Sequence, residues 1–135
     1  MAEHDYSGLA RRLWDAYNRH DLDAMSALTH PDFVGRSVNP IAEGGEPYRG
    51  REGARRWWAD LFETFSDVQA DLHHALVIGD RMFQMLTITY TTREGMALPT
   101  PVWIVTEFDD ELVKYVRTFL DPAEAFEHMA ERLRS

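Results

Sequence analysis

Two side chains of this sequence could transfer or donate a proton inside a folded core, namely His74 and Tyr17. Histidine titrates near neutral pH, so a buried, neutral imidazole can act as a general base. A tyrosine can donate a hydrogen bond, but its reference pKa of about 10 makes it a poor base at neutral pH. We therefore expect His74 and Tyr17 to be the catalytic residues if the protein is an enzyme. The structural alternative for His74 is a core histidine that is hydrogen-bonded to a neighbour.

Metal and thiol chemistry find little support in the sequence. The chain has no cysteine, which excludes disulfides, cysteine-bound zinc and thiol nucleophiles. His73 and His74 are adjacent, so on a strand they point to opposite faces and cannot share a metal ion. Asp71 and His73 share a face, but one such pair falls short of a metal site. We expect no metal and no cofactor.

Charge and hydropathy narrow the classes of partner. There are 14 basic and 23 acidic side chains, a net charge of −9, which argues against binding to nucleic acid. The N-terminus lacks a basic stretch followed by an apolar one, and no apolar run approaches the roughly 18 residues of a membrane span. We expect a cytoplasmic protein that binds neither nucleic acid nor a membrane.

The elements that would position His74 and Tyr17 follow from the spacing of apolar side chains. Apolar residues three to four apart predict four helices, and alternation predicts a short strand and then four strands joined by short turns. The expected helices are about Tyr6–Arg19, Asp21–Leu28, Arg51–Phe65 and one from Asp121; the expected strands are about Phe33–Val38, Val68–Ile78, Arg81–Thr92, Leu98–Phe108 and Leu112–Leu120. Residues 1–135 therefore form one α+β domain, with helices packed on one face of an antiparallel sheet. The loop Asn39–Gly50, rich in proline and glycine, is a natural rim or lid for a site.

Several local phrases, in this order and spacing, carry a resemblance to a known family. They are Ala16-Tyr17-Asn18-Arg19-His20-Asp21-Leu22, Leu28-Thr29-His30-Pro31-Asp32-Phe33, Tyr48-Arg49-Gly50-Arg51-Glu52-Gly53, Ile78-Gly79-Asp80-Arg81 and Phe119-Leu120-Asp121. The chain resembles the nuclear-transport-factor-2-like superfamily, and within it the SnoaL-like branch of polyketide cyclases and ketosteroid isomerase relatives. The resemblance implies a cone-shaped half-barrel, with helices on the concave face of a curved sheet and a deep apolar pocket between them.

The carboxylates that such enzymes use are missing at the corresponding positions. The resemblance places Ser37 where ketosteroid isomerases have their aspartate base, and Leu13 and Ile104 where they have oxyanion donors. SnoaL-like cyclases use an acidic residue near the position of Ile104, and limonene-type epoxide hydrolases need two pocket carboxylates. The usual mechanisms of these relatives therefore have no obvious residues here.

The same register predicts the wall of the pocket. It turns Met85, Thr87 and Thr89 inward on the expected strand Arg81–Thr92, and the alternation on the neighbouring strands turns His74, Ile104, Thr106 and Thr118 inward as well. The expected substrate-binding residues are Trp57, Ser37, Met85, Thr87, Thr89, Ile104, Thr106 and Thr118. Two alternatives stay open: that each threonine is only a good strand former, and that Trp58 lines the pocket instead of Trp57.

Two functions remain. The first is an enzyme that acts by proton transfer on a hydrophobic, cyclic or polyketide-like metabolite, as a lyase, isomerase, cyclase or epoxide opener. The second is a binding or dimerisation module of the same fold without chemistry. We also expect a homodimer through the outer face of the sheet, because an outward face with Met82, Leu86, Ile88 and Tyr90, flanked by Trp103 and Phe119, would be too apolar to face water.

Overall fold

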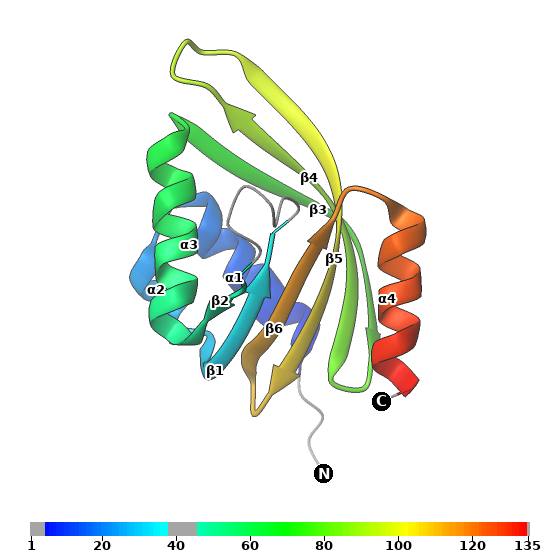
Figure 1. Cartoon of the computed structure of the whole chain (residues 1–135). Coiled ribbons are helices and arrows are strands. Elements are labelled where there is room, and N and C mark those ends of the chain that lie inside the picture. The colour runs from blue at the N-terminus through cyan, green and yellow to red at the C-terminus, as the bar shows by residue number, and fades with distance from the viewer. Residues whose placement is uncertain (1–4, 38–45, 135) are drawn as a thin grey trace.

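The structure, a computed structural model, describes residues 5–37 and 46–134. It contains four helices and one curved, six-stranded sheet (Figure 1). The elements are α1 (Tyr6–Asn18), α2 (Leu22–Ala27), β1 (Thr29–Arg36), β2 (Tyr48–Arg49), α3 (Gly50–Thr64), β3 (Asp67–Ile78), β4 (Arg81–Thr91), β5 (Ala97–Asp109), β6 (Leu112–Phe119) and α4 (Pro122–Arg134). The predicted α+β class with a curved, mostly antiparallel sheet is confirmed. Residues 39–45 of the predicted rim loop lie outside the described part of the chain, as does Val38, the expected end of the first strand.

The sheet has the strand order β2-β1-β6-β5-β4-β3. Strands β3 to β6 form the predicted antiparallel meander, while β1 runs parallel to β6 and brings β2 to the opposite edge. Strand β1 begins at Thr29, four residues before the expected start at Phe33, and its pairing with β6 is interrupted between Thr29 and Val34. Pro31 lies in this interruption, where a residue without an N–H group costs no ladder hydrogen bond.

Helices α1, α2 and α3 lie together on the concave side of the sheet (Figure 1). Helix α1 presents an apolar stripe to the sheet, and the side chains of Leu9, Leu13 and Tyr17 are buried there. Aspartate side chains cap the first two helices: Asp5 accepts a hydrogen bond from the Gly8 amide, and Asp21 accepts one from the amide of Ala24.

Helix α3 approaches β1 closely because Gly35 has no side chain. A Cβ atom at Gly35 would come within 2.6 Å of the Trp57 ring and within 2.7 Å of the Phe33 ring. Phe33 is fully buried and its ring lies 6.1 Å from that of Trp58. The glycine therefore brings both tryptophans of α3 against the concave face, which forms one wall of the space described below.

Helix α4 lies on the convex side of the sheet, apart from the other three helices (Figure 1). Its Ala125 and Met129 are buried against Phe83, Val105 and Phe119, which form a second apolar cluster on that side. The expectation of helices on one face thus holds for α1 to α3, and α4 adds a layer on the other face.

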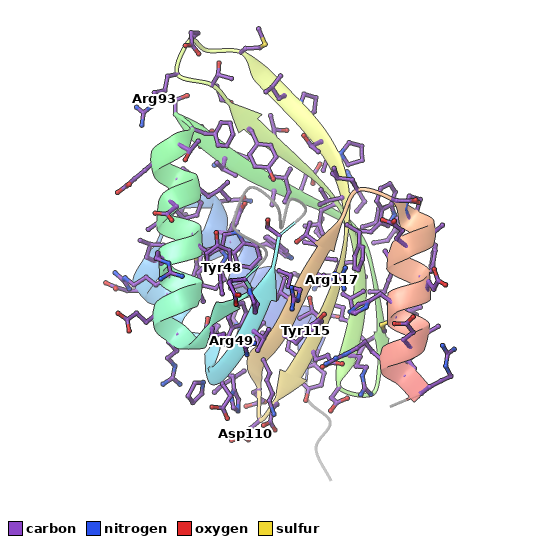
Figure 2. The ribbon with its side chains drawn as sticks, viewed as in Figure 1. Tyr48, Arg49, Arg93, Asp110, Tyr115 and Arg117 are labelled. Atoms are coloured by element: carbon purple, nitrogen blue, oxygen red, sulfur yellow. The ribbon has the colours of Figure 1, made fainter. Side chains whose placement is uncertain are left out.

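A half-buried ion cluster joins α4 to the sheet. Glu107 of β5 accepts hydrogen bonds from Arg81 Nε and Arg132 Nε, both at 2.9 Å. Nearby, the Tyr115 hydroxyl lies 2.8 Å from His128 Nε2. Figure 2 labels Tyr115 and Arg117 on β6, the strand whose convex side packs against α4. The guanidinium groups of Arg81 on β4 and Arg132 on α4 thus bind the same carboxylate, which holds the C-terminal helix in place.

Candidate functional site

A cavity lies between the concave face of the sheet and helices α1 and α3. Its volume is about 580 Å³, within the range of small-molecule sites. The lining residues come from α1, α2, α3, β4, β5 and β6 and the chain segments next to them: Leu13, Trp14, Tyr17, Met25, Ser37, Trp57, Trp58, Leu61, Thr64, Phe65, Gln84, Ile88, Tyr90, Thr100, Val102, Ile104, Thr106, Val116, Thr118 and Leu120.

The described wall of this cavity carries no charged side chain. Its surface is mostly aliphatic and aromatic, and its polar groups are hydroxyls, the indole N–H groups of three tryptophans and one amide. Such a wall can enclose an apolar ring system and make a few directional hydrogen bonds. It offers neither a carboxylate nor an imidazole among the residues that the structure describes.

Tyr17 is the most deeply buried hydroxyl-bearing aromatic residue of the wall. Its side chain is held edge-on by the rings of Trp14 and Phe62, with ring centroids 5.1 and 5.4 Å away. Burial raises the pKa of Tyr17 far above its ordinary value, and the neighbouring Tyr90 raises it further. Burial also raises the pKa of Tyr90. Both phenols therefore keep their protons at neutral pH, so they act as hydrogen-bond donors rather than as bases.

A polar chain crosses the wall from α1 to β5. Trp14 Nε1 donates to Gln84 Oε1 at 2.8 Å, and Gln84 Nε2 donates to Thr106 Oγ1 at 3.0 Å. Gln84 and Thr106 are buried polar side chains in an otherwise apolar core, at 2% and 3% exposure. This chain connects a helix to two neighbouring strands directly beneath the cavity.

Six of the predicted site residues, including Tyr17, lie together around the cavity. Tyr17, Ser37, Trp57, Ile104, Thr106 and Thr118 all line the cavity. Trp58 lines it as well, so the predicted choice between the two tryptophans is not exclusive. Side chains on β5 and β6 alternate regularly between the two faces along the cavity. The rule that every second residue of a strand shares a face therefore predicted the inward residues of these two strands correctly.

The predicted inward face of β4 is wrong. Met85 pairs with Trp103 of β5, which packs against the cluster under α4, so Met85, Thr87 and Thr89 lie on the convex face. The opposite set points inward, and Gln84, Ile88 and Tyr90 line the cavity. Because side chains alternate, an error of one residue moves the whole set to the other face.

The predicted inward position of His74 is also wrong. The pairing of β3 with β4 shifts between Leu72 and His74, so His73 is the extra residue of a β-bulge. Val68, Ala70 and Leu72 point inward as expected, but His74 pairs with Met85 and lies exposed on the convex side. His73 is also exposed, and its Nε2 lies 2.8 Å from Thr87 Oγ1. Neither imidazole reaches the cavity.

The apolar face of β4 that motivated the homodimer prediction points into the protein and not to solvent. Met82, Leu86 and Ile88 are buried in the core on the concave side, and Tyr90 lines the cavity. Trp103 and Phe119 do lie on the convex face, as predicted, where they pack in the cluster beneath α4.

Sequence reasoning missed Trp14, Gln84, Ile88 and Tyr90 as wall residues. A signal for the last three was present: the set containing Met82, Leu86 and Ile88 is more apolar than the set containing Thr87 and Thr89. In a two-layer domain the more apolar face of a central strand is the one that packs against the core. The Trp14 indole carried no such signal, because its N–H group is matched only by the tertiary position of Gln84.

Two smaller hollows lie elsewhere and have charged walls. One, of about 390 Å³, lies around Glu107, Arg81, Lys114 and Asp109. The other, of about 230 Å³, lies between β6 and α4 and includes Arg117. Within residues 5–37 and 46–134, no three histidine, aspartate or glutamate side chains are grouped to hold a metal ion. None of the helices there is long and apolar enough to cross a bilayer.

A curved sheet with three helices over its concave face and a deep apolar cavity between them defines the cone-shaped fold of the nuclear-transport-factor-2-like proteins. The model of the SnoaL-like domain matches residues 10–116, and the chain belongs to this family. The family includes small-molecule isomerases and cyclases. No curated protein matches the chain.

Solved structures share the fold at low sequence identity. An NTF2-like protein of unknown function from Burkholderia pseudomallei is 16% identical, with a TM-score of 0.78 over 93% of this chain and 97% of that one. A protein called a SnoaL-like polyketide cyclase, from Jannaschia sp. CCS1, is 18% identical, with a TM-score of 0.74 over 96% and 97%. A Mycobacterium tuberculosis protein, solved in complex with estradiol-17beta-hemisuccinate, is 13% identical, with a TM-score of 0.73 over 87% and 94%.

Proposed function

We propose that the cavity binds an uncharged, flat, hydrophobic ring compound with carbonyl or hydroxyl oxygens, and that the protein is an isomerase or cyclase of such compounds. The observation that carries the proposal is the cavity of about 580 Å³, whose described wall is aromatic, aliphatic and hydroxylic but uncharged. A charged ligand would lose its hydration there without gaining a counter-charge, which is costly. A neutral ring system loses little and gains apolar contact.

The family and one structural relative support this class of ligand. SnoaL-like proteins include polyketide cyclases, and the Mycobacterium tuberculosis relative was solved with a steroid derivative in complex. Both a steroid and a folded polyketide are flat, mostly apolar and edged with oxygens. The tryptophan pair of α3 and the aromatic residues of α1 offer stacking surfaces for such a molecule.

The wall supports one kind of chemistry best, the stabilisation of an enol or enolate. Tyr17 stays protonated, so its hydroxyl donates a hydrogen bond to a ligand carbonyl oxygen. When the adjacent C–H bond breaks, its electrons form the C=C bond, negative charge moves to that oxygen, and the donated bond strengthens. The released proton goes to water, since the described wall holds no carboxylate or imidazole.

The absence of a protein base from the described wall favours a second candidate, binding without chemistry. In this case the same cavity shelters a neutral ring compound and releases it unchanged. Both candidates require the cavity to be occupied, and they differ only in what happens at the carbon next to the carbonyl group.

Deuterium exchange into 2-tetralone, a flat ketone with enolisable hydrogens, separates the two candidates. We expect the protein in D₂O to exchange these hydrogens faster than buffer does, as followed by NMR, and Tyr17→Phe to lose most of that acceleration. Removal of a single donor to a developing oxyanion typically costs about 10²-fold or more. Binding of 2-tetralone without any acceleration would contradict the isomerase or cyclase proposal and establish the binding function.

A further inference from the structure

The hydrogen-bonded chain formed by Trp14, Gln84 and Thr106 has a fixed direction. An indole N–H group can only donate, so the side-chain oxygen of Gln84 must be the atom that faces Trp14. The amide NH₂ group of Gln84 then faces Thr106 and donates to its hydroxyl oxygen at 3.0 Å. The Trp14 indole therefore determines the orientation of the Gln84 amide.

This direction decides what Thr106 can offer to a ligand. Its oxygen already accepts from Gln84, so its own hydrogen must point elsewhere. Among the described residues the Thr106 hydroxyl accepts from Gln84 and donates to no other group, and the residue lines the cavity. The residue as a whole is 3% exposed, so its hydroxyl has little access to bulk water. The cavity floor thus presents a donor that has no partner within the described protein.

We propose that Gln84 is a positioning residue that holds the Thr106 hydroxyl as a hydrogen-bond donor, so that this corner of the cavity selects ligands with a carbonyl oxygen. The inference rests on the proposed function in one respect, that a ring compound occupies the cavity. It adds which polar group that compound carries at the cavity floor. Thr106 would touch the ligand, while Gln84 acts through Thr106.

A buried donor without a partner makes the site selective against ligands that cannot accept. A ligand lacking an oxygen at this position leaves the Thr106 hydrogen unpaired, and a buried polar group in that state is costly. A hydrocarbon of the same shape would fill the cavity equally well but would leave that penalty in place. We therefore expect discrimination between ketone and hydrocarbon rather than a general gain in affinity.

A purely structural role for the same chain is the alternative. Gln84 and Trp14 join α1 to the sheet, so their loss could loosen the fold without any effect on ligand choice. The two roles differ in their readout: a structural role changes thermal stability and leaves the ratio of ligand affinities unchanged. The test therefore measures a ratio of affinities.

The first experiment compares 9-fluorenone with fluorene, two flat molecules of the same ring shape that differ by a carbonyl oxygen. Equilibrium dialysis should show that the protein prefers the ketone by about tenfold, the effect of one hydrogen bond. Thr106→Val keeps the shape of the side chain and should remove most of this preference. Thr89→Val makes the same change on the convex face of β4 and should keep it.

A variant that reverses the direction of the hydrogen bond between residue 84 and Thr106 gives a sharper test. At a pH high enough to ionise the buried carboxyl group that Gln84→Glu introduces, this group would accept from both Trp14 and Thr106, which turns the Thr106 oxygen towards the cavity as an acceptor. This variant should bind the alcohol 9-fluorenol better than 9-fluorenone, whereas the unaltered protein prefers the ketone. Circular dichroism checks folding, and if Gln84→Glu does not fold, Gln84→Met serves instead and should bind ketone and alcohol with similar affinity.

The outcomes separate this inference from the proposed function. If the unaltered protein binds neither fluorenone nor fluorene, the proposed function fails and the inference fails with it. If it binds both with equal affinity, or if Thr106→Val and the Gln84 variants leave the ketone preference unchanged, only the inference is overturned. A ketone preference that Thr106→Val removes and Gln84→Glu inverts supports it.

Discussion

At the scale of single residues, the part of the cavity wall that the structure describes is a set of donors without a base. Tyr17 and Tyr90 hold their protons because burial raises the pKa of both phenols. Thr106 donates because Gln84 occupies its oxygen. Donors arranged in an uncharged, mostly apolar wall favour a ligand whose oxygens accept, and they stabilise negative charge that develops on such an oxygen.

The raised pKa of Tyr17 predicts how ligand binding depends on pH. The phenol stays protonated in the folded protein at any pH at which an ordinary tyrosine does, so the donor is never lost there. We expect the affinity for a neutral ketone such as 9-fluorenone to be constant from about pH 6 to about pH 10. Equilibrium dialysis across this range measures it. A decline in affinity with a midpoint near neutral pH would show that an imidazole or another group controls the site.

The exposed position of His74 predicts that this residue is dispensable. His74→Gln changes a side chain on the convex face that lies outside the cavity. We expect ligand affinity, exchange rate and melting temperature to match those of the unaltered protein, since surface substitutions usually change stability by less than about 0.5 kcal/mol. Loss of exchange activity with unchanged stability would restore His74 as a catalytic residue and contradict the placement.

At the scale of elements, the strands differ in how far their faces could be predicted. On β5 and β6 the alternation is uninterrupted along the cavity, so parity alone placed Ile104, Thr106 and Thr118 correctly. On β3 the bulge at His73 reverses the alternation halfway along the strand. Nothing in the local sequence marks a bulge, because it is set by pairing with another strand. The helices and turns were predictable, since capping residues and apolar spacing are local signals.

The attachment of α4 through Glu107 predicts an effect on stability. Burial alone would raise the pKa of Glu107, but hydrogen bonds from Arg132 and Arg81 outweigh it and hold the pKa below its ordinary value. Glu107→Gln removes the charge that both guanidinium groups meet, and we expect a loss of about 1–3 kcal/mol in unfolding free energy. Urea unfolding measures it. Glu94→Gln, in the exposed turn after β4, is the matched control and should change little.

The same pKa shift gives the sign of the pH dependence. Because the folded pKa of Glu107 lies below the unfolded one, its stabilisation is complete above the unfolded pKa of about 4.3 and is lost as the pH falls through the folded value. Between pH 6 and pH 3 the unaltered protein should therefore lose more stability than Glu107→Gln does. Parallel curves for the two proteins would show that Glu107 is not ionically paired in solution.

At the scale of the whole molecule, the concave side holds the cavity and the convex side holds α4. The predicted homodimer stays a prediction, without the apolar face that first motivated it, because that face is turned inward. Light scattering at micromolar concentration measures the assembly directly. A mass of twice 15.6 kDa supports the homodimer, and a stable monomer contradicts it.

The central claim is that the cavity takes up a neutral ring compound, and tryptophan fluorescence tests it most directly. Of the four tryptophans, Trp14, Trp57 and Trp58 line the cavity, and only Trp103 lies on the convex face. In a Trp103→Phe background, titration with 9-fluorenone should quench the emission saturably at one ligand per chain.

Two matched variants locate the binding. Thr118→Phe fills the cavity and should weaken binding by at least about tenfold, while Thr89→Phe adds the same ring to the convex face and should leave it unchanged. Quenching that never saturates, or that both variants weaken equally, would contradict the claim that this cavity is the functional site.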